Sequence, residues 1–171
     1  MLTSFRALVV LVCLLPLYSS ASELLPLQPL IDETHDGETL LLPAGRYAGP
    51  VIIDHPMILD GNGEATIDAG GKGTVILLDT DGATIRNLHL TNSGESHNDI
   101  DSAIQVRGKF NVIKDNNIDN CLFGIDLQQS ENNVVRRNNI SSKDFELGQR
   151  GDAIRLWYSF DNKIIDNTIT D

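Results

Sequence analysis

The sequence predicts an all-β protein whose short strands wind into a parallel β-helix, a solenoid of stacked coils. One observation is a repeated phrase, Asn-x-φ-x-x-Asn-x-Ile with φ aliphatic, which begins at Asn111, Asn133 and Asn162. Another is an interleaved aliphatic strand phrase, which begins at residues 75, 103, 124 and 153. Such self-similarity indicates units that bury their apolar sides by stacking on one another.

The spacing of the repeats defines the coil. Successive copies of the strand phrase start 28, 21 and 29 residues apart, so a coil of about 22 residues carries insertions at 92–101 and 141–150. Parallel strands need a crossover, and without helices between the strands that crossover is a turn of the coil itself. Both insertions leave the same point of the coil, which predicts one loop-rich flank suited to binding.

The first 21 residues have the pattern of a secretory signal peptide. Arg6 precedes the apolar run 7–17, and Ser19-Ser20-Ala21 is a small-residue cleavage site. The run of 11 residues is too short to cross a bilayer comfortably. We therefore expect a periplasmic protein that starts near Ser22 and has no membrane span after cleavage.

Residues 22–171 are expected to form the β-helix domain. Apolar residues in 24–33 recur at roughly helical spacing around Pro26 and Pro29, which predicts a short N-terminal cap, as solenoids need for solubility. Short strands are expected at 39–42, 51–53, 56–61 and 65–68, with turns at 43–47 and 70–73.

The second Asn of the repeated phrase falls in one column of the predicted solenoid, at Asn116, Asn138 and Asn167. Buried amides must find partners, and stacked Asn side chains can bond one another as a ladder. A weaker copy at 82–90 has Leu88 in this position. The column is therefore assigned a structural role.

Strand alternation sorts the side chains of the aliphatic phrase. The inward set is Ile104, Val106, Ile125, Leu127, Ile154 and Leu156. Asp126 and Arg155 point outward, with Arg107 and Trp157 beside them. This predicts an exposed polar and aromatic patch, either a partner or ligand surface or a solvated face with weak ion pairs.

Acidic residues on the insertions flank this patch. Asp99, Asp101 and Asp152 lie there, and Arg150 and Asp152 extend the expected surface. Paired carboxylates can act as general acid and base on glycosides or bind Ca²⁺. Asp126, Asp152 and Arg155 are the catalytic set of this alternative hypothesis.

The net charge and the candidate metal ligands limit the classes of partner that the sequence allows. Residues 1–21 contain one cation and no acid, so their removal changes the formal charge from −11 to −12. This argues against nucleic acid and anionic membranes and suits a cation, a basic protein or a neutral glycan. His55, Met57 and Cys121 would suit copper if the fold brought them together, although no pair has ligand spacing. As the only cysteine after residue 21, Cys121 is expected to be buried and inert.

Five segments narrow the assignment further: residues 37–50, 85–94, 122–125, 150–159 and 162–167. Together they resemble the NosD family of exported right-handed β-helix proteins. Arg150 to Ser159 is the most specific segment, whereas the Asn phrases are shared by carbohydrate-binding and sugar-hydrolase β-helices in general. The resemblance implies an accessory protein, rather than a hydrolase, that works beside an ABC transporter to assemble the copper–sulfide centre of nitrous oxide reductase.

The resemblance also has a consequence for the extent of the chain. Members of the family are longer, and this chain stops at Asp171 within a coil, so we expect an N-terminal part that lacks several coils. The rival hypothesis, motivated by Asp126, Arg155 and Trp157, is a β-helix that binds or cleaves polysaccharide.

Overall fold

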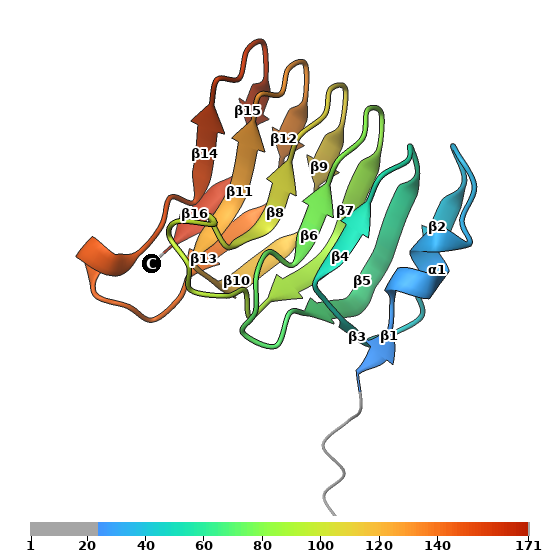
Figure 1. Ribbon diagram of the computed structural model, residues 1–171, viewed down its shortest axis with the longest axis horizontal. Coiled ribbons are helices and arrows are strands. Elements are labelled where there is room, and N and C mark those ends of the chain that lie inside the picture. The colour runs from blue at the N-terminus through green and yellow to red at the C-terminus, as the bar shows by residue number, and fades with distance from the viewer. Residues whose placement is uncertain (1–23, 171) are drawn as a thin grey trace, which may run out of the picture.

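The computed structural model describes residues 24–170, which form a stack of coils with a short helix at the N-terminal end (Figure 1). The signal peptide expected over residues 1–21 lies outside the described residues. Within 24–170, no helix has the length and apolar character needed to cross a membrane.

Two parallel sheets make up the walls of the solenoid within residues 24–170. Sheet A has eleven strands: β1 (Leu25–Pro26), β2 (Thr39–Leu41), β3 (Gly45–Ala48), β5 (Ile58–Asp68), β7 (Thr84–Thr91), β9 (Val112–Lys114), β10 (Asn117–Cys121), β12 (Val134–Arg136), β13 (Asn139–Ser142), β15 (Lys163–Ile165) and β16 (Thr168–Thr170). Sheet B has five, in the order β14 (Ile154–Trp157), β11 (Phe123–Gln128), β8 (Ser102–Val106), β6 (Ile76–Leu78) and β4 (Val51–Ile53). The predicted parallel β-helix is confirmed.

The N-terminal cap is helix α1 (Gln28–Asp32), which buries Ile31. Two details of the first coils differ from the prediction. Residues 45–47, expected in a turn, belong to β3, and the strands expected at 56–61 and 65–68 are one strand, β5, whose register shifts between Asp60 and Ala65. The glycines in these segments predicted turns, but pairing with the neighbouring coil makes the segments strands.

The core lies between the two sheets and consists mainly of Ile, Leu and Val. Ile104, Val106, Ile125 and Leu127 have no exposed area, as the alternation predicts. Full burial of such a side chain contributes about 2 kcal/mol. Leu156, also expected inward, is 48% exposed, because β14 is an edge strand and its coil packs on one side only among the described residues.

The predicted Asn ladder is present at one corner of the coil. Asn138 Nδ2 donates to the Ile113 carbonyl at 3.1 Å and to Asn167 Oδ1 at 2.9 Å. Asn138 Oδ1 accepts from the backbone N–H of Asn116 at 3.1 Å. Asn138 therefore bonds the coil before it and the coil after it, and backbone groups freed by the bend find partners.

A second ladder, whose role the sequence did not indicate, stands at the next corner. Asn133 Nδ2 donates to the Gly108 carbonyl and to Asn162 Oδ1, each at 3.0 Å, and Asn133 Oδ1 accepts from the Asn111 N–H at 2.8 Å. The residue before each ladder Asn has a positive φ: Phe110, Asp115, Asn132, Arg137, Asp161 and Asp166. This residue in the left-handed conformation bends the chain, and the side chain of the Asn that follows bonds backbone N–H and C=O groups at the bend.

Replacing one amide of the first ladder should destabilise the fold strongly. Asn138→Ala removes the side-chain bonds to two coils and leaves the buried Asn116 N–H without its acceptor, which should cost about 3 kcal/mol. The neighbouring Asn139 is exposed and donates one side-chain bond, to Asn117, so Asn139→Ala should cost less than about 1 kcal/mol. Urea denaturation measures both, and equal free energies of unfolding would contradict the ladder's role.

Candidate functional site

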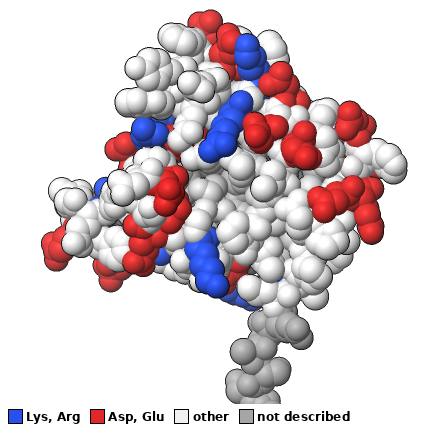
Figure 2. Space-filling model, viewed as in Figure 1, with Lys and Arg blue, Asp and Glu red and all other residues white. Residues whose placement is uncertain are grey.

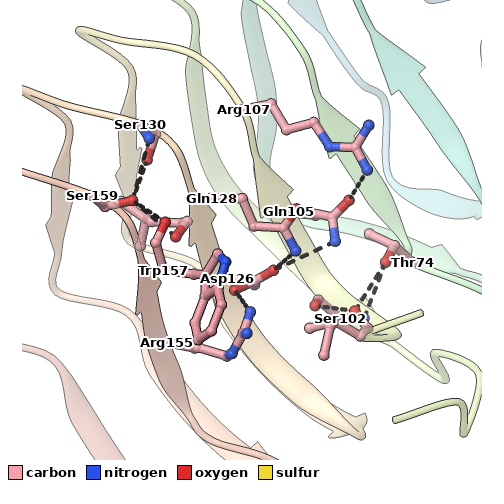
Figure 3. Close-up of polar contacts among 12 residues, drawn as sticks. Thr74, Ser102, Gln105, Arg107, Asp126, Gln128, Ser130, Arg155, Trp157 and Ser159 are labelled. Atoms are coloured by element: carbon pink, nitrogen blue, oxygen red, sulfur yellow. Dashed lines mark hydrogen bonds and ion pairs between the residues drawn. The ribbon is translucent and has the colours of Figure 1, made fainter. Parts of the chain in front are cut away.

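The outward face of sheet B carries a hydrogen-bonded cluster around Asp126 (Figure 3). Its members stand side by side because the register pairs Gln105 with Asp126 and Asp126 with Arg155. Arg155 Nη1 donates to Asp126 Oδ1 at 2.8 Å. Gln128 and Gln105 donate to Asp126 Oδ2 at 2.6 and 3.4 Å. We call Gln105, Asp126, Gln128 and Arg155 the Asp126 cluster.

The expectation that Asp126 is exposed is wrong. It points outward as predicted, but its exposed fraction is 0% because Gln105, Gln128 and Arg155 close over it. With both oxygens bonded and no path to solvent, this carboxylate holds Arg155 in place and is unsuited to acid–base chemistry on a substrate.

The outer layer of this face is aromatic and cationic. The Arg155 guanidinium carbon lies 5.0 Å from the centre of the Trp157 ring, a cation–π arrangement. Trp157 is 51% exposed and meets Tyr158 edge-on at 5.1 Å. Arg107 donates to Gln105 at 2.8 Å and is itself exposed. Trp157 and Arg107 are therefore the accessible groups, and the hydrogen-bonded Asp126 cluster beneath them holds them in place.

The two insertions lie together on one flank, as predicted. Lys143 Nζ from the second lies 3.5 Å from Glu95 Oε1 of the first, and His97 packs edge-on against Phe123 of β11. The acids of the first insertion make hydrogen bonds within their own loop. Asp101 accepts from the Ser96 N–H at 2.9 Å, and Asp99 accepts from the Ser96 hydroxyl at 2.7 Å.

Arg150 and Asp152 line a cavity of about 340 Å³ under the second insertion, not the Trp157 surface. The cavity also contacts Cys121, Ser142 and Leu147. Asp152 precedes β14, whereas Asp126 lies sealed within sheet B. The structure thus divides the predicted surface into two parts, Arg107 with Arg155 and Trp157, and Arg150 with Asp152.

The three candidate copper ligands are not brought together. Met57 precedes the first residue of β5, whereas Cys121 ends β10, which pairs through β7 with the opposite half of β5. Met57 and Cys121 are each 1% exposed. His55 lies beside Asp54, with 3.1 Å between Nδ1 and Oδ1. Among the described residues, no group of three or more His, Cys, Asp or Glu is placed to hold a metal.

Local packing explains the glycines in the segments that resemble NosD. A Cβ added to Gly124 would lie 2.2 Å from the Ala153 carbonyl oxygen, and one added to Gly151 would lie 2.5 Å from that of Leu122. The coils approach each other here too closely for any side chain. Ser159 donates to the Leu127 carbonyl at 3.0 Å and joins the last described coil to β11.

Comparison with known proteins fits this architecture. A family model described as the right handed beta helix region matches residues 59–171. The chain belongs to the right-handed β-helix family. No solved structure is significantly similar to this β-helix.

Two relatives of this β-helix carry the same name. It is 32% identical over 132 residues to a probable ABC transporter binding protein NosD from Pseudomonas aeruginosa, a match that covers 75% of this chain and 31% of that protein. A second protein of this name from the same species is 26% identical over 95 residues, which are 56% of this chain and 87% of the relative. The resemblance to NosD is thus confirmed over a region that spans less than a third of the first relative.

Removing the buried carboxylate of the Asp126 cluster should destabilise this β-helix and release the aromatic surface. Asp126→Ala leaves Arg155 and two Gln amides without their acceptor, a loss of about 3 kcal/mol or more. Emission from Trp157, the only Trp of the chain, should shift toward that of solvated Trp as its cationic neighbour becomes mobile.

Asp79 provides the control, because it is an exposed acid that directly follows a strand of the same sheet. Asp79→Ala should leave both the free energy of unfolding and the emission nearly unchanged. An Asp126→Ala protein as stable as the Asp79→Ala protein would contradict the assigned role.

The Cys121 thiol should react slowly in the folded chain. Burial raises the pKa of Cys121 to about 11, so only about a thousandth of it is thiolate at pH 8, against roughly a quarter for an ordinary cysteine. In a chain without residues 1–21, alkylation at pH 8 should be at least about 10²-fold slower in buffer than in urea. Comparable rates would show an accessible, reactive thiol.

Proposed function

We propose that this chain is an exported NosD-type accessory protein that acts with an ABC transporter in assembling the copper–sulfide centre of nitrous oxide reductase. The observation that carries the proposal is the similarity to the NosD of P. aeruginosa, at 32% identity over 75% of the chain. That relative is named as a probable ABC transporter binding protein. The periplasm is the compartment in which the expected signal peptide would place the chain.

The outward face of sheet B supports a recognition function. Trp and Arg are the residue types that dominate binding energy at protein interfaces, and here they rise from a buried, hydrogen-bonded base. Because these contacts already order the exposed side chains, less side-chain entropy is lost on binding. On the face of the molecule shown in Figure 2, cations lie singly and acids lie in several groups rather than in one block. We therefore place the partner contact at Trp157 and Arg107.

Disruption of the gene tests the proposed role directly. The reductase polypeptide should accumulate at its usual level but lack the copper–sulfide centre, measured by metal content and visible absorption of the purified enzyme. The intact gene supplied on a plasmid should restore the centre. A reductase with a normal centre in the disrupted strain would refute the proposal.

The partner surface is tested in the same strain. Complementation with a Trp157→Ala variant should reduce recovery of the transporter or reductase with the protein by about tenfold or more, as for an interface hot spot. Leu41→Ala is the matched control, because Leu41 is 57% exposed but lies in β2 of the other sheet, in the first coil of the stack. Equal recovery with both variants would place the contact elsewhere.

A second candidate, glycan binding, is favoured by one observation. Trp157 and the neighbouring Tyr158 are 51% and 69% exposed, and Gln128, a residue with a side-chain amide, is the register partner of Trp157. Binding to a glycan array that Trp157→Ala abolishes would support this candidate. Cleavage by Asp126 is not part of it, since that carboxylate is sealed.

A further inference from the structure

The outward face of sheet A carries a hydrogen-bonded chain of three side chains, one each from β5, β7 and β10. These three strands are neighbours in the sheet (Figure 1). Thr66 Oγ1 lies 3.2 Å from His89 Nδ1. On its other side, His89 Nε2 lies 2.8 Å from Asp119 Oδ2. The register causes this, because it pairs Thr66 with His89 and places Asp119 opposite Thr91, two residues further along β7.

The order of these groups settles the hydrogen-bond directions. The Asp119 carboxylate can only accept, so Nε2 of His89 donates to it, and Nδ1 of a neutral imidazole is then an acceptor. The hydroxyl of Thr66 is the donor that faces this acceptor. A hydroxyl bonded to a histidine that a carboxylate orients is the arrangement of an activated oxygen nucleophile.

The hydroxyl and the imidazole open onto a surface cavity of about 410 Å³. The cavity is also lined by Asn117, Glu64 and Asp115. Asn117 is in register with His89, and its Nδ2 donates to no group among the described residues. Because His89 stands between Asn117 and Thr66, this amide can bond the part of a ligand that lies over the imidazole.

The charges of the rim limit the ligand. Asp115 is neutralised by Arg137, whose two nitrogens lie 2.7 and 2.9 Å from its oxygens. Glu64 has no ion-pair partner among the described residues, so the rim disfavours anions.

We propose that Thr66, His89 and Asp119 form a hydrolytic site for neutral or cationic carboxylic esters, an activity separate from the proposed accessory function. Thr66 Oγ1 attacks the ester carbonyl carbon while its proton passes to His89 Nδ1. The C–O bond to the alcohol then breaks, and the alcohol leaves with that proton. Water hydrolyses the acyl-threonine by the same route, which returns the proton to Thr66 and yields one acid and one alcohol per water consumed. Thr66 and His89 are catalytic residues, and Asp119 is a positioning residue.

A purely structural reading also exists, in which the three groups are cross-strand contacts on a solvated sheet. Thr91 illustrates such a contact, because its hydroxyl bonds Asp119 Oδ1 at 2.5 Å without touching the imidazole. A covalent acyl intermediate on the hydroxyl that faces His89 distinguishes the hydrolytic site from a purely structural contact.

Hydrolysis of p-nitrophenyl acetate by the purified chain tests the proposal. Thr66→Val and His89→Asn should each lower kcat/KM by at least about 10²-fold, whereas Thr66→Ser should retain activity. Asp119→Asn should lower kcat with KM nearly unchanged, because it misorients the base without altering the cavity. Acid-quenched protein should carry an acetyl group on Thr66 by peptide mass spectrometry.

The controls use residues of the same type outside the chain of contacts. His97→Asn removes another histidine, and Thr84→Val removes another hydroxyl of β7; both should retain activity within about twofold. Thermal unfolding checks that every variant is folded. No hydrolysis above the buffer rate, no acetyl on Thr66, or equal losses in His97→Asn and His89→Asn would each overturn the proposal.

Discussion

The structure depends on how the coil satisfies its backbone at the corners. A residue with positive φ bends the chain before each ladder Asn, and the bend frees N–H and C=O groups in the interior of the stack. The Asn side chain supplies both a donor and an acceptor, so one residue bonds the coils on either side. Because unmet buried polar groups cost about 1–3 kcal/mol each, the ladders hold successive coils in one register.

That register positions the chemistry of both outward faces. In a parallel stack, equivalent residues of successive coils become neighbours even when about 22–30 residues separate them in the sequence. On sheet B this places Arg155 beside Asp126, and on sheet A it places Thr66 beside His89. The two faces differ accordingly, one with an aromatic and cationic surface over a sealed carboxylate, the other with a hydroxyl and an imidazole at an open cavity.

Much of the architecture could be predicted from periodicity. The ladder at Asn116, Asn138 and Asn167, the inward Ile125 and the two loop insertions all follow from the repeats, because stacking demands that equivalent residues share an environment. The Asn111 column was not assigned a ladder from the sequence, although it follows the same kind of bend as the Asn116 column. Strand β3 escaped because glycine and proline around it indicate turns unless a neighbouring coil pairs with the backbone.

The sequence by itself determined the coil, its direction of stacking and the faces on which side chains emerge, because these depend on local alternation and on a repeat. Only the tertiary structure decided which outward groups are accessible. Asp126 and Trp157 both point outward, yet one is 0% and the other 51% exposed, because the depth of a side chain depends on the reach of its neighbours on adjacent coils. For the same reason the contact of His89 with Thr66 and Asp119 became visible only once three strands were in register.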